Sequence, residues 1–511
     1  MEMQGKEKIM TKRRMFVMSG IILLCCSVPV IKGHAANAEI GEFKEAPCPF
    51  ALPEGLVLGE NFKFGYVNVP EFHEKRNGKF LQLAVAIFPS SGEKPAPDPL
   101  VMNTSGPGKS NMDNFVPDIA AMLGKFLLPD RDIVIIELRG LRYSKPFLMC
   151  NEVFEARKSM MEKNLSPEET KTIIQKALKA SRDRFVREGI NLSAFNNVET
   201  AADIALIMAG LGYDKFNIVG SSAGTLVAHH VIRDYPERVR CAVMDAGLPI
   251  EPAIVRDMVP NFIDVLKRYF EQCNNDPACK SAYPDLEKRF LNLLDSLNRN
   301  PVTIPINDPQ TGKEINYVLN GYRVAGFVSM SMYFSTQIPS MIGKILAGDY
   351  SEIKEHARSM LTPNYFADGL GHTIFLSEAG DYSYSDIKID PAYSVFAKGI
   401  SDFGLGGEYE LYVNEIWNIP CMDSKRIQYQ KEYDVPVLVL NGMYDPVIPP
   451  KYDTEMKKHL KNCYLFRFDG VPHSAFDNAT ACVLPMMLEF LKDPSKAPDS
   501  SCVKNYKLQL K

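Results

Sequence analysis

A glycine–serine pentad between a short apolar run and a helical run constrains the fold of this chain more than any other segment. Phe216–Val219 is typical of a strand, Gly220–Gly224 reads Gly-Ser-Ser-Ala-Gly, and Thr225–Tyr235 has a helical pattern. A strand that turns so tightly into a helix needs glycine at the corner, because a side chain there would collide with the neighbouring backbone. Such a turn presents its central residue, Ser222, at the end of a sheet, where the hydroxyl can attack a carbonyl. The alternative is a Gly/Ser loop that caps a helix.

Short apolar runs that favour strands recur along the chain, and helical patterns separate the later ones. In the first half these runs are Phe64–Val69, Leu81–Phe88, Pro99–Asn103, Asp132–Leu138, Phe216–Val219 and Val239–Asp245. Two more, Val435–Asn441 and Cys463–Phe468, are each followed by a helical pattern. Strands that alternate with helices predict an α/β fold, with a mostly parallel sheet and helices on both of its faces.

The alternation stops between Glu251 and about Arg426, where the chain reads as helices and loops with few strand-like runs. An α-rich insertion of this kind predicts a cap domain that lies over the ends of the strands. We therefore expect a core made of residues 39–250 and 427–511, with a helical cap domain at 251–426. The stretch Asn151–Glu188 is also helical and charged, and we expect it to form a smaller surface excursion.

The N-terminus has the pattern of a secretory signal peptide. Five basic residues between Lys6 and Arg14 precede the apolar run Met15–Ile31, and small residues follow as far as Ala38. This order predicts a cleaved signal over residues 1–38 and export to the periplasm or the medium. A lipid-modified Cys26 is a weaker alternative, because such sites usually carry a smaller residue just before the cysteine. No later segment is long and apolar enough to predict a membrane span.

The charge of the chain limits its class of binding partner, and its cysteines bear on whether it forms disulfides. The chain has 511 residues, 23% of them charged, and a net charge of −4, so it lacks the basic excess of a nucleic-acid-binding protein. Export permits disulfides, and spacing makes two pairs plausible: Cys273 with Cys279 around a short turn, and Cys482 with Cys502 across the final helix. Nine of the eleven cysteines follow the predicted signal, so at least one thiol stays free.

A serine hydroxyl is a weak nucleophile at neutral pH, so it needs a neighbouring base and an acid that orients the base. On a sheet of this plan the acid follows the strand after the insertion, and the histidine follows the last strand. Asp445 follows Val435–Asn441 in a proline-rich loop, and His473 follows Cys463–Phe468. The order Ser222, Asp445, His473 therefore predicts a catalytic triad.

Each partner also has a plainer interpretation. Asp445 precedes Pro446, a common position for a turn residue, and His473 is equally compatible with a surface histidine. Asp245 and Asp469 are the alternative acids. His229 and His230 lie on the helix of the nucleophile itself, and we expect them to point away from the site.

The negative charge that develops on the attacked carbonyl oxygen needs backbone N–H donors. Ala223 supplies one, directly after the nucleophile and at a helix N-terminus where the helix dipole adds to the effect. A second donor is expected from the loop Asn103–Ser110, which reads Asn-Thr-Ser-Gly-Pro-Gly-Lys-Ser after an early strand. A simple turn is the alternative interpretation of that loop.

Taken together, these segments resemble the proline iminopeptidase and tripeptidyl aminopeptidase family of α/β-hydrolase serine peptidases. The resemblance covers most of the mature chain and is carried by Phe64–Glu71, Asn103–Ser110, Glu137–Ser144, the nucleophile segment with Tyr235–Arg240, and Asp445–Pro450. It implies the α/β-hydrolase fold, a triad of Ser222, Asp445 and His473, and an oxyanion hole shaped by Gly106 and Ala223. It also makes Glu378 a candidate to hold the free amino group of a substrate.

The chain departs from the family pattern around the site and not in the triad. Phe64 and Leu376 stand where the family often has cysteines, and Ala223 and Arg142 replace an aromatic residue and a glycine. Thr104, Ser105 and Lys109 replace Pro, Gly and Gly in the oxyanion loop. These differences concern the loops that decide the choice of substrate.

The sequence thus predicts a secreted serine aminopeptidase that cleaves short peptides or proline-type residues from free N-termini through an acyl-enzyme. It implies no metal or organic cofactor. The first alternative is an exported carboxylesterase or lipase with the same triad, which would lack an anchor for the substrate amine. The second is a non-catalytic binding protein that has kept the fold.

Overall fold

The computed structural model describes residues 40–103, 106–250, 253–378, 380, 382–402, 404 and 406–510. The predicted signal peptide, Cys26, Thr104 and Ser105 lie outside the described residues. Residues 39–511 form one compact unit.

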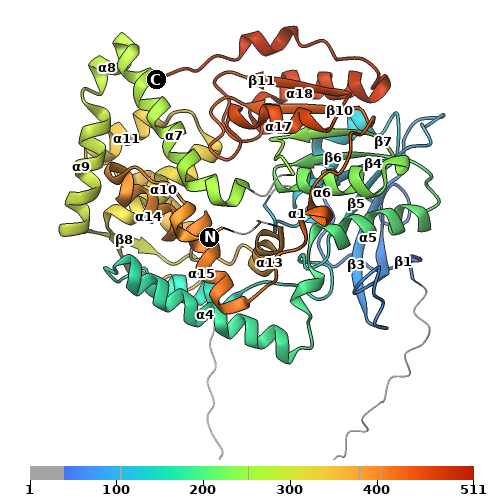
Figure 1. Ribbon diagram of the computed structural model, residues 1–511, viewed down its shortest axis with the longest axis horizontal. Coiled ribbons are helices and arrows are strands. Elements are labelled where there is room, and N and C mark those ends of the chain that lie inside the picture. The colour runs from blue at the N-terminus through green and yellow to red at the C-terminus, as the bar shows by residue number, and fades with distance from the viewer. Residues whose placement is uncertain are drawn as a thin grey trace, which may run out of the picture. The chain divides into compact units, whose positions relative to one another are not determined.

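The centre of this unit is a nine-stranded sheet with the strand order β1-β2-β3-β5-β4-β6-β7-β10-β11 (Figure 1). Its strands are β1 (Phe43–Glu45), β2 (Lys63–Pro70), β3 (Phe80–Phe88), β4 (Leu100–Asn103), β5 (Ile133–Ile136), β6 (Phe216–Ser221), β7 (Val239–Asp245), β10 (Val437–Gly442) and β11 (Cys463–Phe468). The pairs β1–β2, β2–β3 and β3–β5 are antiparallel, and every pair from β5 to β11 is parallel. The predicted α/β fold with a mostly parallel sheet is confirmed.

Helices cover both faces of the sheet because alternate strand residues are apolar on opposite sides. In β3, Leu81, Leu83 and Val85 join one core cluster, whereas Ala84 and Ala86 join another. The first face is covered chiefly by α3 (Asn151–Met160), α4 (Pro167–Arg187), α5 (Asn197–Gly210), α6 (Ala223–Asp234) and α17 (Asp453–Lys458). The second face is covered by α1 (Asn111–Asp118), the π-helical turn Ile119–Leu123, α2 (Gly124–Leu127) and α18 (Ala475–Lys492).

The register of the parallel strands brings their carboxyl ends to one level. Asn103 of β4 pairs with Gly220 of β6, and Ser221 of β6 pairs with Asp245 of β7. Asp245 in turn is level with Leu440 of β10. The segments that follow β4, β6, β7, β10 and β11 therefore leave the sheet at the same edge, where α/β proteins place their binding sites.

Between β7 and β10 the chain inserts a long, mostly helical segment, which lies to one side of the sheet (Figure 1). Its helices are α7 (Ala253–Asn275), α8 (Pro277–Ala282), α9 (Leu286–Arg299), α10 (Gly321–Phe334), α11 (Ile338–Leu346), α12 (Ser351–Ser359), α13 (Asp368–Glu378), α14 (Ser394–Asp402), α15 (Gly407–Trp417) and α16 (Ser424–Ile427). Most of them pack around an apolar cluster separate from the two faces of the sheet. An antiparallel hairpin, β8 (Val302–Asn307) with β9 (Glu314–Leu319), adds to the helices that the sequence predicts. The domain boundaries at 250/251 and 426/427 stay a prediction.

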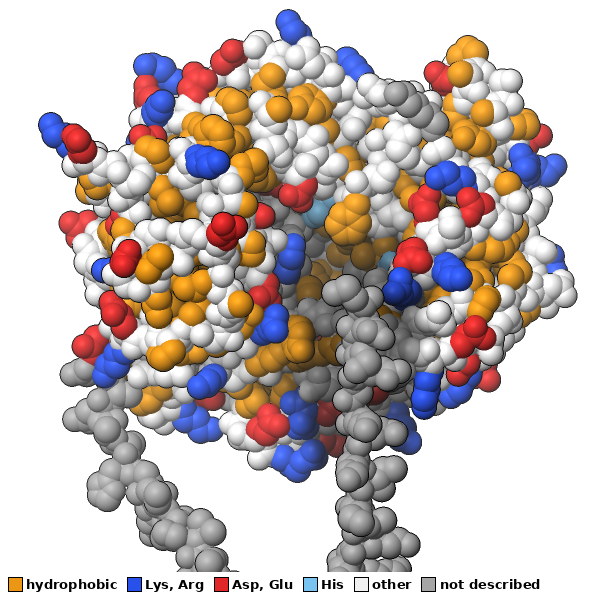
Figure 2. Space-filling model, turned by 180° about the vertical axis from the view of Figure 1, so that it is seen from behind, with side chains coloured by type: hydrophobic (Ala, Val, Ile, Leu, Met, Phe, Trp, Pro, Cys, Tyr) orange, Lys and Arg blue, Asp and Glu red, His pale blue; other side chains and the backbone are white. Residues whose placement is uncertain are grey.

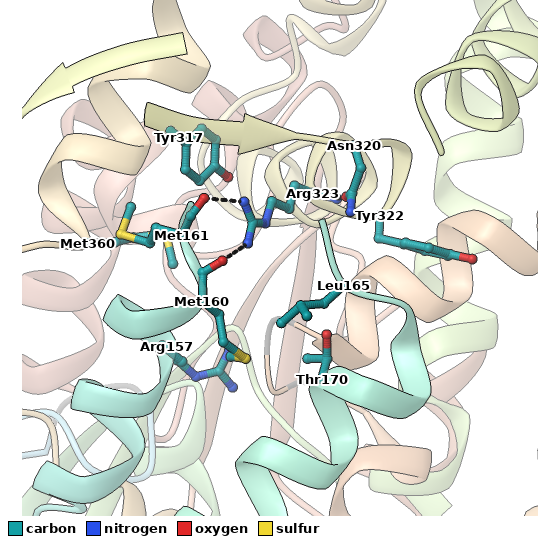
Figure 3. A pocket seen from close by; sticks show the side chains of 10 residues that line it. All are labelled: Arg157, Met160, Met161, Leu165, Thr170, Tyr317, Asn320, Tyr322, Arg323 and Met360. Atoms are coloured by element: carbon teal, nitrogen blue, oxygen red, sulfur yellow. Dashed lines mark hydrogen bonds between the residues drawn. The ribbon is translucent and has the colours of Figure 1, made fainter. Parts of the chain in front are cut away.

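The helical stretch Asn151–Glu188 is tied to this insertion. Arg323 of α10 donates hydrogen bonds to the carbonyl oxygens of Met160 (2.6 Å) and Met161 (2.7 Å), beside a pocket between the two segments (Figure 3). Trp417 of α15 donates to the carbonyl of Leu178 at 3.1 Å. The stretch expected to be a surface excursion therefore forms part of the support of the inserted helices.

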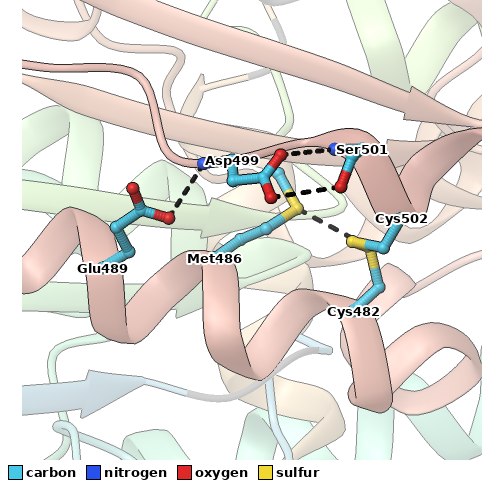
Figure 4. Close-up of a disulfide and its surroundings, with 6 residues drawn as sticks. All are labelled: Cys482, Met486, Glu489, Asp499, Ser501 and Cys502. Atoms are coloured by element: carbon cyan, nitrogen blue, oxygen red, sulfur yellow. Dashed lines mark hydrogen bonds between the residues drawn. A yellow bond between two sulfur atoms is a disulfide. The ribbon is translucent and has the colours of Figure 1, made fainter.

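Both of the disulfides that spacing makes plausible are present, Cys273–Cys279 and Cys482–Cys502. The second joins α18 to the C-terminal tail. Glu489 of α18 also accepts a hydrogen bond from the backbone N–H of Asp499 at 2.9 Å (Figure 4). In the part of the chain that the structure describes, no helix combines the length and apolar character that a membrane crossing requires.

Candidate active site

Ser222 occupies a strained turn between β6 and α6. Its backbone has φ 52° and ψ −120°, an unusual conformation for a residue with a side chain. The turn is as tight as the pentad predicts, because a Cβ atom on Gly220 would lie 2.4 Å from the carbonyl oxygen of Gly224. Backbone hydrogen bonds from Ser222 N to Asp245 O (2.9 Å) and from Thr225 N to Ser222 O (2.8 Å) fix it. Ser222 thus stands at the carboxyl edge of the sheet, at the N-terminus of a helix.

Asp445 and His473 lie in direct contact, although 28 residues separate them. The Nδ1 atom of His473 lies 2.7 Å from Oδ2 of Asp445. The second oxygen of Asp445 accepts hydrogen bonds from the backbone N–H groups of Val447 (2.8 Å) and Ile448 (2.9 Å). Asp445 is fully buried and His473 is 8% exposed. A carboxylate held in this way fixes the ring with a proton on Nδ1 and leaves Nε2 free to accept one.

The loops that carry this pair are bonded to each other and to the sheet. Met443 N donates to Phe468 O at 2.9 Å, and Tyr444 N donates to Val471 O at 3.0 Å. Arg467 of β11 donates to the carbonyl oxygens of Gly442 (2.9 Å) and Ile448 (3.0 Å) on either side of Asp445. The inserted segment also contributes, because Arg268 of α7 donates to the carbonyl of Met443 at 2.7 Å.

The electrostatic interaction between Asp445 and His473 shifts their pKa values in opposite directions. Burial tends to raise the pKa of the Asp445 carboxyl, but the charge and hydrogen bond of His473 and two backbone N–H groups outweigh it, so the pKa is lowered. Burial tends to lower the pKa of His473, but the charge and hydrogen bond of Asp445 outweigh it, so the pKa is raised. The pair therefore favours an anionic aspartate beside a histidine that readily accepts a proton.

The two alternative acids have other partners. Asp245 accepts hydrogen bonds from Ser474 Oγ (2.7 Å) and from the backbone N–H groups of Ala475 (2.7 Å) and Phe476 (3.0 Å). It thereby satisfies the N-terminus of α18, and burial raises its pKa to about 6. Asp469 is half exposed and lies 3.6 Å from the ammonium group of Lys507. Of the three acids, Asp445 is the one in hydrogen-bonding contact with His473.

The two segments expected to shape an oxyanion hole both reach the carboxyl edge of the sheet. Ala223 is the first residue of α6, so its N–H is one of the donors that the helix leaves unsatisfied. Gly106 follows β4 by three residues and has φ +106°. A small cavity lined by Pro107, Gly108 and Ala223 joins the two segments.

Glu378 stands at the end of α13 and is largely buried. Its carboxylate accepts hydrogen bonds from the N–H of Asn197 (2.8 Å) and from Asn197 Nδ2 (2.9 Å), and His230 Nε2 lies 3.3 Å away. Burial tends to raise the pKa of Glu378, but the charge and hydrogen bond of His230 and the bonds from Asn197 outweigh it, so the pKa is lowered. His230 was expected to point away from the site. It does lie two helical turns from Ser222, but it contacts a candidate site residue.

An aromatic side chain of the inserted segment packs against the imidazole of His473. The ring of Tyr333, in the last turn of α10, meets that of His473 edge to face, with 5.2 Å between centroids. The next residue, Phe334, is 72% exposed. The space-filling view shows a hollow on one face, edged by hydrophobic side chains, with histidine atoms visible in it (Figure 2).

Two family models match the segments that carry this geometry. One, described as the alpha/beta hydrolase fold, matches residues 98–317, and the other, described as TAP-like protein, matches residues 415–502. The first contains Ser222, and the second contains Asp445 and His473. The chain therefore has the α/β-hydrolase fold, and its C-terminal part is similar to TAP-like proteins.

Among curated relatives of this chain is serine protease Hip1 of Mycobacterium tuberculosis. It is 27% identical over 522 aligned positions, which cover 94% of this chain and 95% of the relative. Carboxylesterase B of the same species is 22% identical over 85% of each chain. Tripeptidyl aminopeptidase of Streptomyces coelicolor is 28% identical over 42% of this chain and 39% of its own length.

Several contacts of this α/β-hydrolase were not predicted from its sequence. Tyr333 beside His473, and Asn197 and His230 around Glu378, come from segments far from the motifs in the chain. A lone tyrosine at the end of a helical pattern carries no signal of such a role. For His230 a weak signal existed, because a buried histidine on the helix of the nucleophile needs a polar partner.

Proposed function

We propose that this α/β-hydrolase is a serine peptidase that works through an acyl-enzyme. The observation that carries the proposal is the geometry of Ser222, Asp445 and His473. The serine stands in a strained strand–turn–helix corner, and the aspartate and histidine lie 2.7 Å apart at the same edge of the sheet. The name of the relative that matches along nearly its whole length, a serine protease, adds support.

The proposed mechanism follows from the tautomer that Asp445 selects. Ser222 Oγ attacks the carbonyl carbon of the scissile bond while its proton passes to His473 Nε2. The N–H groups of Ala223 and Gly106 stabilise the oxyanion. When the tetrahedral intermediate collapses, the leaving amine takes the proton from His473. Water, with His473 as base, then attacks the acyl-enzyme, which releases the acid and restores the serine.

We further propose that the substrate carries a free N-terminal amine, held by Glu378. A buried ammonium needs an anionic partner, and the lowered pKa of Glu378 keeps that carboxyl ionised at neutral pH. The bonds from Asn197 and His230 also join α13 to α5 and α6, so Glu378 has a structural role in the same place. A test of the proposal therefore has to separate the two roles.

Export is part of the proposal as well. The N-terminal basic, apolar and small-residue pattern is that of a secretory signal. The two disulfides are consistent with an oxidising compartment such as the periplasm or the medium.

An esterase is the second candidate function, favoured by the relative named carboxylesterase B. Its triad chemistry would be the same, because esters and amides pass through similar tetrahedral intermediates. It differs in needing no anchor for a substrate amine.

Matched substrates decide between the two functions. The purified protein is assayed with a tripeptide anilide, with its N-acetylated form and with a small neutral ester such as p-nitrophenyl acetate. An aminopeptidase cleaves the free-amine anilide far better than the acetylated one. Equal cleavage of both anilides would contradict the amine anchor, and cleavage of the ester alone would favour the esterase.

A further inference from the structure

The predicted oxyanion loop is built from glycines in conformations that other residues avoid. Gly106 has φ +106° and Gly108 has φ +130°. Glycine has the widest conformational freedom of any residue, so a loop of this kind does not hold its own shape. Pro107 between them fixes only one further φ angle. The position of the Gly106 N–H therefore depends on what packs against the loop.

The ring of Phe366, from the segment just before α13, packs against both glycines. A Cβ atom built on Gly108 would lie 2.7 Å from Cε1 of Phe366, and one built on Gly106 would lie 3.2 Å from Cε2. The end of one aromatic ring therefore lies against both glycines, tightly at Gly106 and with no room for a side chain at Gly108. At Gly108 the packing excludes a side chain on steric grounds as well, because a Cβ atom there would also lie 2.8 Å from the carbonyl oxygen of Ala367.

Hydrogen bonding fixes the same segment to the same loop. Ala367 N donates to the carbonyl oxygen of Gly108 at 2.9 Å. One turn into α13, Gly371 approaches the loop closely, since a Cβ atom there would lie 2.8 Å from the carbonyl oxygen of Pro107. The segment is thus in contact with each of the three residues from Gly106 to Gly108.

The segment around Phe366 also contacts the core on the side away from the oxyanion loop. The guanidinium of Arg142 lies 3.9 Å from the ring centre of Tyr365 and pairs with Asp113 of α1 at 2.8 Å. Gly369 N donates to the carbonyl oxygen of Leu148 at 2.9 Å. Arg142 stands where the family pattern has glycine, so this chain supplies a side chain of its own to support Tyr365.

We propose that Phe366 is a positioning residue, which sets the backbone of Gly106–Gly108 so that the Gly106 N–H can meet the oxyanion. The inference rests on the proposed function. Oxyanion donors act only within about 2.7–3.1 Å of the developing charge, and a displacement of 1 Å in an active site costs on the order of 10² in rate. Phe366 therefore acts on the transition state through the loop and makes no contact with the substrate.

The test compares Phe366→Ala and Phe366→Leu with Tyr384→Ala. Tyr384 is another aromatic residue of the inserted segment, 43% exposed and bonded to Glu415. Each purified variant is measured for kcat, KM, melting temperature and inhibition by phenylboronic acid, which forms a tetrahedral adduct with the serine of such enzymes. Phe366→Ala should lower kcat about 10- to 100-fold, with KM changed less than about twofold. The affinity for phenylboronic acid should fall by a factor similar to that for kcat. In Phe366→Leu, kcat and boronate affinity should lie between those of Phe366→Ala and those of the wild type. In Tyr384→Ala, both should match the wild type.

Other outcomes would overturn the inference. Unchanged kcat and boronate affinity in Phe366→Ala would show that the loop holds its shape without the ring. A raised KM at constant kcat would mean that the ring binds substrate directly. If Phe366→Ala does not fold, the same comparison is made with Phe366→Leu. Failure of the proposed function is a separate result, because Ser222→Ala would then retain turnover whatever residue stands at 366.

Discussion

Two buried aspartates near His473 differ at the residue scale in what they bind. Asp445 contacts the imidazole, whereas Asp245 accepts three hydrogen bonds at the start of α18. Asp445→Asn should therefore lower kcat by about 10⁴, because the amide stabilises the wrong tautomer of His473. Asp245→Asn should have a milder effect on kcat and should lower the melting temperature. Steady-state kinetics and thermal melting of the two variants check this, and reversed effects would place the acid at Asp245.

The raised pKa of His473 predicts the acid limb of the pH profile. The base must be neutral to accept the serine proton, so activity falls as the pH drops through the pKa of His473. Since Asp445 raises that pKa above the usual 6.5, the midpoint of kcat/KM should lie above pH 6.5. In Asp445→Asn the anion is lost, and the residual activity should have its midpoint at lower pH. A pH profile whose midpoint does not move between the two proteins would contradict this ion pair.

A substitution of Glu378 distinguishes a role in binding the substrate amine from a role in supporting the fold. Glu378→Gln should reduce kcat/KM for a peptide with a free amine by a free energy of about 2–5 kcal/mol, because a buried ammonium loses its anionic partner. Hydrolysis of a small neutral ester should change little. Both substrates are assayed on the one variant. An equal loss on both would assign Glu378 to the support of α5, α6 and α13.

At the scale of elements, the disulfide between Cys482 and Cys502 joins α18 to the C-terminal tail. It spans 20 residues, against six for Cys273–Cys279. A cross-link of the longer span stabilises by about 3 kcal/mol in the chain-entropy description, and one of the shorter span by somewhat less.

The double variant Cys482→Ser/Cys502→Ser should therefore melt at a lower temperature than the wild type. It should melt below Cys273→Ser/Cys279→Ser as well. Limited proteolysis should cut its tail after Lys492 sooner, because the cross-link to α18 is gone. If its melting temperature and its cleavage rate both match the wild type, hydrogen bonds such as that from Asp499 to Glu489 hold the tail by themselves.

The strands are the elements that the sequence predicts best. Each predicted run from Phe64–Val69 to Cys463–Phe468 contains or overlaps a strand, because each is a short apolar stretch bounded by polar or turn residues. The hairpin β8–β9 was less visible, since its strands alternate buried and exposed residues inside a helical region. Helical patterns predict that helices exist in the insertion, but they contain no information on which helix meets which loop.

At the scale of the whole molecule, one part of the candidate site could be predicted from the sequence and another part could not. Ser222, Asp445 and His473 could be predicted because each follows a strand of one sheet, and parallel strands bring their carboxyl ends together. The contacts from the insertion could not, since Phe366 meets Gly106 and Tyr333 meets His473 across long stretches of sequence. Those contacts depend on how the inserted helices pack, which no local pattern specifies.

The central claim, that Ser222 is the nucleophile of a serine hydrolase, is tested most directly by a fluorophosphonate probe together with turnover. Ser222→Ala should fold like the wild type, because the removed hydroxyl is small and makes no hydrogen bond that supports the turn. The wild type should bind the probe covalently at Ser222, and peptide mapping locates the adduct. The variant should take up no probe and lose on the order of 10⁶ in kcat. Labelling at another residue, or turnover that survives in a folded Ser222→Ala protein, would contradict the account.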